Sequence, residues 1–164
     1  MNKAALVRGA IGGAVGGALM AVWSVLAMGL TGVGYWTPIN LFAHTAFASA
    51  PLGATFSLPA LIIGLLIHFA VAIGFGVVFA AMMTPARGWL PTTATSAGSG
   101  LVYGLVIWLV MHFLVWSSAD AVAASAFTPW IFAVGHLIYG LTLGLALGRV
   151  QRTVGPAASR PRVH

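Results

Sequence analysis

The chain has 164 residues, of which 60% are hydrophobic and 5% charged, and its net charge of +6 comes from seven Lys and Arg residues against a single acidic residue. A soluble domain carries about 25% charged residues, so this chain lacks the polar groups to cover a surface that faces water, and lipid must be its solvent. The absence of cysteine excludes disulfides, thiolate metal sites and cysteine nucleophiles. The cations form no dense patch interleaved with aromatic residues, which argues against a nucleic-acid partner.

Four apolar segments are long enough to cross a bilayer, which takes roughly 20 residues of helix. They comprise residues 9–30, 58–83, 97–116 and 129–147. Ser57-Leu58-Pro59 and Thr128-Pro129 each place a hydroxyl before a proline in the first turn, which is a helix-start signal. The sequence therefore predicts an all-α membrane protein, a bundle of four transmembrane helices. We expect one transmembrane domain at residues 1–154 and a flexible basic tail at 155–164.

Positive charge falls on one side of this even-numbered topology. The cations precede the first span, lie between the second and third, or follow the fourth: Lys3, Arg8, Arg87, Arg149, Arg152, Arg160 and Arg162. The positive-inside bias therefore predicts that both termini are cytoplasmic. A cleaved signal peptide ending near residues 48–50 is the rival interpretation. It is disfavoured because the first apolar run is too long and ends well before that site.

The two loops expected outside span residues 31–57 and 117–128. Thr37-Pro38 predicts the start of a short helix at 39–50 in the membrane interface, a depth that suits Tyr35 and Trp36. A smaller equivalent is expected to begin near Ser118. Asp120 lies in this second loop, where a solvated or capping role is favoured over a contact with His112 at the outer mouth of the bundle.

Glycines recur at four-residue spacing in three of the spans. Helices in lipid associate through close approach of small residues, so these rows predict helix-packing faces. The expected packing residues are Gly9, Gly13, Gly17, Gly76, Gly100, Gly104, Gly140, Gly144 and Gly148, with Gly12 and Gly16 beside the first row.

The second and fourth spans resemble each other in sequence. Small residues follow each central histidine at the same spacing: His68 precedes Ala72, Gly76 and Ala80, and His136 precedes Gly140, Gly144 and Gly148. This pattern predicts a tandem repeat of two helical hairpins related by an axis along the membrane normal.

Four histidines lie in or above the outer half of the predicted bundle: His44, His68, His112 and His136. At the helical rise per residue, His68 lies about 15 Å and His136 about 10 Å below the outer ends of their spans. Neighbouring small residues place the three histidines in the spans toward the packed side of their helices. Because a polar residue in a membrane interior is a functional candidate by default, these side chains form the candidate site.

Three interpretations of the histidines remain open. Each imidazole can hydrogen-bond a neighbouring helix and hold the bundle together. Alternatively, His68, His112 and His136 ligate a haem, or these three and His44 bind a metal ion, since neutral imidazole suits iron, copper and zinc. In the third interpretation they form a proton or ion path, although no acidic partner continues it through the inner half.

The segments WLVMHFLVW and FTPWIFAVGHLIYG resemble the YagU-like group of small bacterial inner-membrane proteins. The shared features are His112 in the third span, a proline-bearing outer loop, and Gly135-His136-Leu137 in the last span. His68 in the second span fits the same layout. This chain lacks the acidic residues that the group tends to have in its outer loop. The resemblance implies a location in the bacterial inner membrane and a fold, but no activity.

Motifs of enzymes are missing from the sequence. It has no carboxylate pair, no phosphate-binding glycine loop, no HExxH motif and no Ser-His-Asp set within the spans. Six Trp and nine Phe residues are available for lateral contacts instead. We therefore expect a non-enzymatic protein of the lipid bilayer that associates with itself or serves as an accessory subunit of a larger membrane complex. The alternatives are a histidine-ligated haem or metal protein and a small channel or transporter with a histidine-lined path.

Overall fold

The computed structural model describes residues 3–83 and 92–153, with side chains in the last helix described as far as Gly148. Arg87 and the predicted tail at 155–164 lie outside the described residues. The described elements are all helical, in the order α1 (Lys3–Leu30), α2 (Thr37–His44), α3 (Leu58–Met83), α4 (Thr93–Val110), the π-helix η2 (Met111–Trp116), α5 (Ser117–Ala119), α6 (Ala121–Ala126) and α7 (Pro129–Thr153).

Four helical stretches are long and apolar enough to cross a membrane, and they match the four predicted spans. They are α1, α3, the continuous run from α4 to α5, and α7 as far as Gly148. Large apolar side chains such as Ile11, Leu66 and Val102 are more than half exposed on their outer faces. Exposed apolar surface of this kind suits contact with lipid, while the helical backbone satisfies its own hydrogen bonds.

The starts of two helices follow from local capping. Helix α3 begins at the predicted residue, where Ser57 Oγ accepts a hydrogen bond from the Ala60 N–H at 3.4 Å. Helix α4 begins before the predicted residue 97, because Thr92 and Thr95 form a capping box in which each side chain bonds the other residue's backbone N–H. Two hydroxyl residues three positions apart were the signal that apolarity alone did not reveal.

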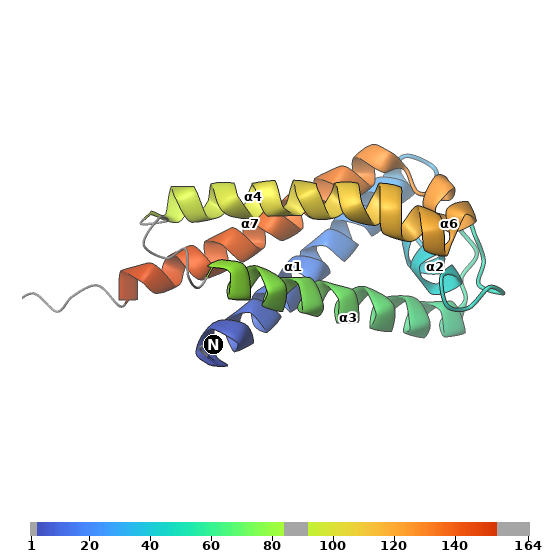
Figure 1. Ribbon diagram of the computed structural model, residues 1–164. Coiled ribbons are helices and arrows are strands. Elements are labelled where there is room, and N and C mark those ends of the chain that lie inside the picture. The colour runs from blue at the N-terminus through green and yellow to red at the C-terminus, as the bar shows by residue number, and fades with distance from the viewer. Residues whose placement is uncertain (1–2, 84–91, 154–164) are drawn as a thin grey trace, which may run out of the picture.

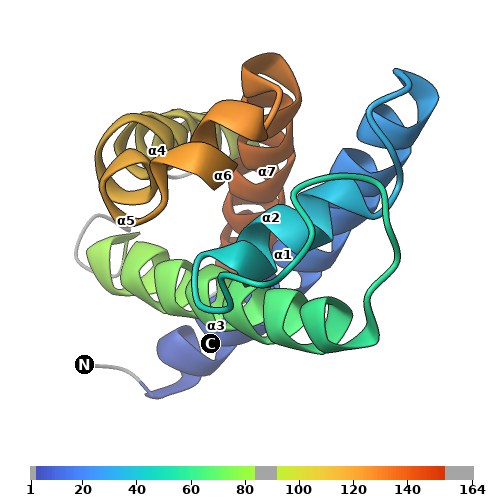
Figure 2. The same ribbon diagram turned by 90° about the vertical axis from the view of Figure 1, so that its right-hand side faces the viewer.

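Helix α1 packs against α3 on one side and against α7 on another (Figures 1 and 2). A Cβ added at Gly13 would lie 2.5 Å from the Ala72 carbonyl oxygen of α3. A Cβ added at Gly16 would lie 3.0 Å from the Tyr139 ring of α7. The two neighbouring glycine rows of α1 therefore serve two different partners.

The second close pair is α4 with α7. Glycine backbones face one another here: a Cβ at Gly100 would meet the Gly140 carbonyl oxygen, and a Cβ at Gly104 would meet the carbonyl oxygen of His136. All nine glycines predicted to pack helices lie at such contacts within the chain. The predicted glycine faces lie between helices of one molecule.

The outer end of the bundle, at the right of Figure 1, is covered by α2 and α6. Helix α2 is shorter than the predicted helix at 39–50 because the chain turns after His44, where the Phe47 N–H bonds the Ala43 carbonyl at 2.8 Å. Leu41 and Ala43 are fully buried against the bundle, so α2 is packed into the outer end of the protein. The helix predicted near Ser118 is present as α5 and α6, which are separated at Asp120.

The third span ends in a π-helix, η2, that the sequence did not predict. Ser117 Oγ donates to the His112 carbonyl oxygen at 2.6 Å, which supplies a partner to a backbone group in the widened turn. Both His112 and Trp116 are buried, whereas Phe113 between them is exposed. Single-turn π-helices often occur at functional sites, and this one borders a cavity in the outer half of the bundle.

Candidate ligand-binding cavity

A cavity of about 210 Å³ lies within the outer half of the bundle. Its walls come from all four spans and from α2. The lining residues are almost entirely apolar and aromatic: Met20, Phe42, Thr45, Ile67, His68, Val71, Ala72, Phe75, Ile107, Met111, Val115, Trp116, Ala119, Phe132, His136 and Tyr139. An engineered apolar cavity of about 150 Å³ stays dry and binds benzene, so this volume holds a substituted ring or a short chain.

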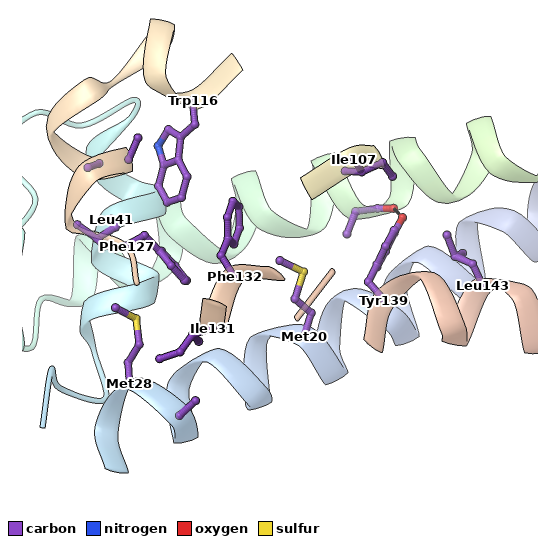
Figure 3. Packing of buried hydrophobic residues seen from close by; sticks show 14 of the residues in the cluster. Met20, Met28, Leu41, Ile107, Trp116, Phe127, Ile131, Phe132, Tyr139 and Leu143 are labelled. Carbon is purple, nitrogen blue, oxygen red and sulfur yellow. Dashed lines mark hydrogen bonds between the residues drawn. The ribbon is translucent and has the colours of Figure 1, made fainter. Parts of the chain in front are cut away.

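The outer end of the cavity is closed by stacked aromatic rings. Phe42 of α2 lies parallel to Trp116 of η2, with ring centroids 5.1 Å apart and planes 4° apart. Phe132 of α7 packs against Trp116 with ring centroids 5.3 Å apart, and Figure 3 shows the two side chains near one another. The Trp116 indole N–H donates to Thr45 Oγ1 at 3.0 Å, which ties η2 to the loop after α2.

Two tyrosines close the inner end. The Tyr139 hydroxyl of α7 donates to the Ala72 carbonyl of α3 at 2.5 Å, and the Tyr103 hydroxyl of α4 donates to the Phe75 carbonyl of α3 at 2.8 Å. The Phe79 and Tyr103 rings pack at 4.8 Å one turn further in. The cavity therefore occupies one half of the bundle, and its inner end is bounded by the two hydrogen-bonded tyrosine side chains.

One side of the cavity opens onto the lipid-facing surface between α3 and η2. Val71 on α3 and Val115 on η2 both line the cavity, yet they are 40% and 46% exposed. Ala119 at the end of α5 lines it and is exposed as well. This side of the cavity therefore lies next to exposed apolar surface.

His68 lies in the cavity wall and links two spans. Its Nε2 is 2.9 Å from the Gly17 carbonyl oxygen of α1, and its side chain is buried. A carbonyl oxygen only accepts hydrogen bonds, so Nε2 carries the proton and Nδ1 keeps a free lone pair. The contact joins α3 to α1, as expected for a histidine that hydrogen-bonds a neighbouring helix, and Gly17 lies close to the imidazole.

His136 lies across the cavity on α7 and bonds its own helix. Its Nδ1 is 2.9 Å from the Phe132 carbonyl oxygen one turn earlier, so Nδ1 carries the proton and Nε2 keeps its lone pair. Its ring packs edge-to-face on Phe132 with centroids 4.4 Å apart. The predicted contact was to a neighbouring helix, whereas this hydrogen bond stays within α7.

His112 is buried at the contact between η2 and α7 and does not line the cavity. Its ring stacks on Trp108 with centroids 6.2 Å apart and planes 8° apart, and it packs against Phe132 at 5.8 Å. Nδ1 of His112 and Nε1 of Trp108 have no hydrogen-bond partner among the residues described. The predicted alternative of a contact between His112 and Asp120 is wrong, because Asp120 has a different histidine as its partner.

That partner is His44, at the end of α2. Nδ1 of His44 is 2.6 Å from Oδ2 of Asp120, and Oδ1 of Asp120 accepts the Ala123 N–H at 3.0 Å, which caps α6. Burial alone would raise the pKa of Asp120, but the hydrogen bonds from Ala123 and His44 and the charge of His44 outweigh it and lower the pKa. The predicted capping role of Asp120 is confirmed, and its carboxylate also joins the two outer loops.

The structure thus separates the four predicted histidines. His68 and His136 share the cavity, His112 lies between two helices, and His44 pairs with Asp120 at the outer end. Across residues 3–83 and 92–153, no group of three or more His, Cys, Asp or Glu side chains is arranged to hold a metal ion. Two-histidine haem ligation stays a prediction, with His68 and His136 as the pair that faces a common space.

Sequence reasoning did not identify the cavity itself. Its lining comes from segments far apart in the chain, and most of its members, such as Ile67, Val71 and Met111, have no chemical signal in an apolar helix. The sequence predicts interfacial or lateral contacts for aromatic residues such as Phe42 and Trp116, whereas these two side chains form the outer wall of the cavity. Only the packing of the helices reveals which apolar side chains border empty space.

Comparison with known proteins places the chain in one family. The family of unknown function DUF6789 matches residues 3–157, nearly the whole chain. The chain belongs to this family. No curated protein and no solved structure matches it. The resemblance to the YagU-like group stays a prediction, since the match to DUF6789 carries no link between the two families.

Proposed function

We propose that this DUF6789 protein binds a small, largely apolar molecule that reaches it through the membrane. The observation that carries the proposal is the cavity, which is open to the lipid-facing side and closed toward both ends of the bundle. Ligand pockets are concave and mostly apolar, with a few polar groups that fix orientation, and here His68 and His136 are those groups. A chamber that ends at tyrosine hydrogen bonds favours binding over conduction along a continuous path.

Val115→Phe tests this function, because the larger ring would occupy the opening of the cavity. We expect a brominated apolar probe, bromobenzene, to quench the fluorescence of Trp116 saturably in protein reconstituted in nanodiscs. Trp116→Phe should abolish that component, and Val115→Phe should weaken the apparent affinity at least tenfold. Val106→Phe is the matched control, since Val106 is similarly exposed on α4 but does not line the cavity. Quenching that is linear in probe concentration and independent of Trp116 would contradict the proposal.

We also propose that the protein resides in the bacterial inner membrane with both termini in the cytoplasm. The described start of α1, the end of α3, the start of α4 and the end of α7 lie at one end of the bundle, at the left of Figure 1. The seven cations of the sequence flank those ends. A fluorescent protein fused after His164 should mature and fluoresce, and alkaline phosphatase at the same place should be inactive. The opposite pattern would reverse the orientation.

A tandem repeat of two hairpins remains part of the proposal. Contacts that support it pair Gly17 with His68 in the α1–α3 hairpin and Gly104 with His136 in the α4–α7 hairpin. In each pair the glycine of the first helix contacts the histidine of the second, and small residues follow both histidines at steps of four residues. If the halves are related, the two halves of family members aligned in this register should be more alike than shuffled sequences of equal composition.

Lateral association, as a self-associating protein or an accessory subunit, has less support than ligand binding. The nine glycines that suggested lateral association already pack against other helices of the same chain. Exposed aromatic side chains such as Phe113 and Trp130 still offer contact area. A strictly monomeric protein that co-purifies with no partner in mild detergent would count against this non-enzymatic role.

A further inference from the structure

The polar groups of the cavity share one property: their hydrogen-bond donors are already used. Trp116 donates to Thr45, and Thr45 Oγ1 makes a long contact of 3.5 Å to the Leu41 carbonyl. The Tyr139 hydroxyl donates to Ala72 at 2.5 Å. The lining therefore presents no unpaired indole or hydroxyl donor to a molecule inside.

The two histidines complete this pattern. The N–H of His68 is committed to Gly17 and the N–H of His136 to Phe132. The remaining nitrogens, Nδ1 of His68 and Nε2 of His136, make no hydrogen bond within the described chain. Neither is among the fully enclosed polar atoms that lack a partner. Both rings line the cavity, so their lone pairs are available to a molecule that occupies it.

We propose that the cavity selects membrane-soluble molecules whose buried head carries a hydroxyl hydrogen-bond donor, such as a phenol, a quinol or an isoprenoid alcohol. The inference rests on the proposed function and adds the chemistry of the ligand to it. A hydroxyl placed between His68 and His136 donates to an imidazole lone pair, and the apolar body fills the remaining volume. A quinone or an ether offers only acceptors, so it leaves the two lone pairs without partners.

The magnitude of the selection follows from the cost of an unmade hydrogen bond. In an enclosed apolar site, leaving a buried polar group without a partner weakens binding by about 5- to 150-fold, the fold-change that corresponds to about 1–3 kcal/mol. Sites built to hydrogen-bond a hydroxyl also reject analogues that lack it. We therefore expect at least a tenfold preference for the donor-bearing member of a matched ligand pair.

The test compares 4-bromophenol with 4-bromoanisole, which differ by methylation of the hydroxyl. Binding is followed by saturable quenching of Trp116 in nanodiscs, and each affinity is referred to the probe concentration in the membrane, measured with empty nanodiscs. Wild-type protein should bind the phenol at least tenfold more tightly. His136→Leu should remove most of this preference by weakening the binding of 4-bromophenol far more than that of 4-bromoanisole. His136→Gln, which restores an acceptor oxygen, should recover part of it.

The outcomes separate this inference from the proposed function. Equal, saturable binding of the two probes overturns the selection for a hydroxyl and leaves apolar ligand binding intact. Quenching that does not depend on Trp116 overturns both. Stoichiometric zinc, copper or haem iron in the purified protein, lost in His136→Leu, would assign the lone pairs to a metal and also overturn the selection. His136 is the residue to change because its hydrogen bond stays within α7, so its loss does not separate helices.

Discussion

Gly100→Ala is expected to lower the stability of the bundle by about 1–3 kcal/mol, the usual cost of overpacking an interface that cannot yield. The added methyl would meet the Gly140 carbonyl oxygen and would lie 2.9 Å from the Gly144 Cα. These are backbone atoms, so α4 and α7 must move apart along their whole crossing. The loss appears as a lower midpoint temperature when protein in mild detergent is heated and its remaining monodisperse fraction is measured.

Gly98→Ala is the matched control, because it makes the same substitution two residues earlier on the same helix. A Cβ at Gly98 meets nothing within 4 Å. Alanine favours a helix over glycine by about 1 kcal/mol, so this variant should be neutral or slightly more stable than wild type. Gly76→Ala and Gly74→Ala on α3 form a second such pair, with Gly9 and Gly13 as the obstructing partners. Equal midpoints within either pair would refute the account of close backbone crossing.

Glycine spacing predicted the helix contacts well because close approach in lipid depends on a local property, the size of each side chain. The rows of Gly9, Gly13 and Gly17, and of Gly140, Gly144 and Gly148, could be read without knowing their partners. The partners themselves could not be read in this way. That Gly12 and Gly16 face a different helix from their neighbours follows from the crossing geometry of three helices, which no single segment encodes.

For polar residues, too, the sequence predicts local roles but not the distant partners that packing supplies. Capping by Asp120 is local and was predicted, since an aspartate before a short helix can bond the backbone three residues on. Its pairing with His44 joins residues 76 positions apart and depends on how α2 and α6 meet at the outer end. Similarly, the burial of His68 and His136 was predictable from neighbouring small residues, whereas their meeting at one cavity arises from the packing of the whole bundle.

Helix α2 shows where an isosteric change should have a large effect. Asn40 is buried, and its side-chain amide donates to the carbonyl oxygens of Gly53 and Thr55, each at 2.8 Å. These two bonds hold the loop between α2 and α3 against α2. The sequence marks Asn40 only as a polar residue in an apolar helix, and its role appears once the loop is seen to fold back over it.

Asn40→Asp keeps the shape of the side chain but replaces the amide nitrogen, which supplies both donated hydrogen bonds, with an acceptor oxygen that faces two carbonyl oxygens. A buried charge left without a partner costs about 3–5 kcal/mol, so the loop should detach from α2. We expect proteolysis within residues 45–57 to accelerate by more than tenfold in reconstituted protein, since cleavage follows the population of the open loop. Asn40→Gln, which retains an amide on a longer side chain, should be cut at an intermediate rate.

Because protonation of the introduced carboxylate restores one donor, cleavage of the Asn40→Asp variant should slow as the pH falls. A variant as resistant as wild type at neutral pH would show that these two hydrogen bonds do not hold the loop.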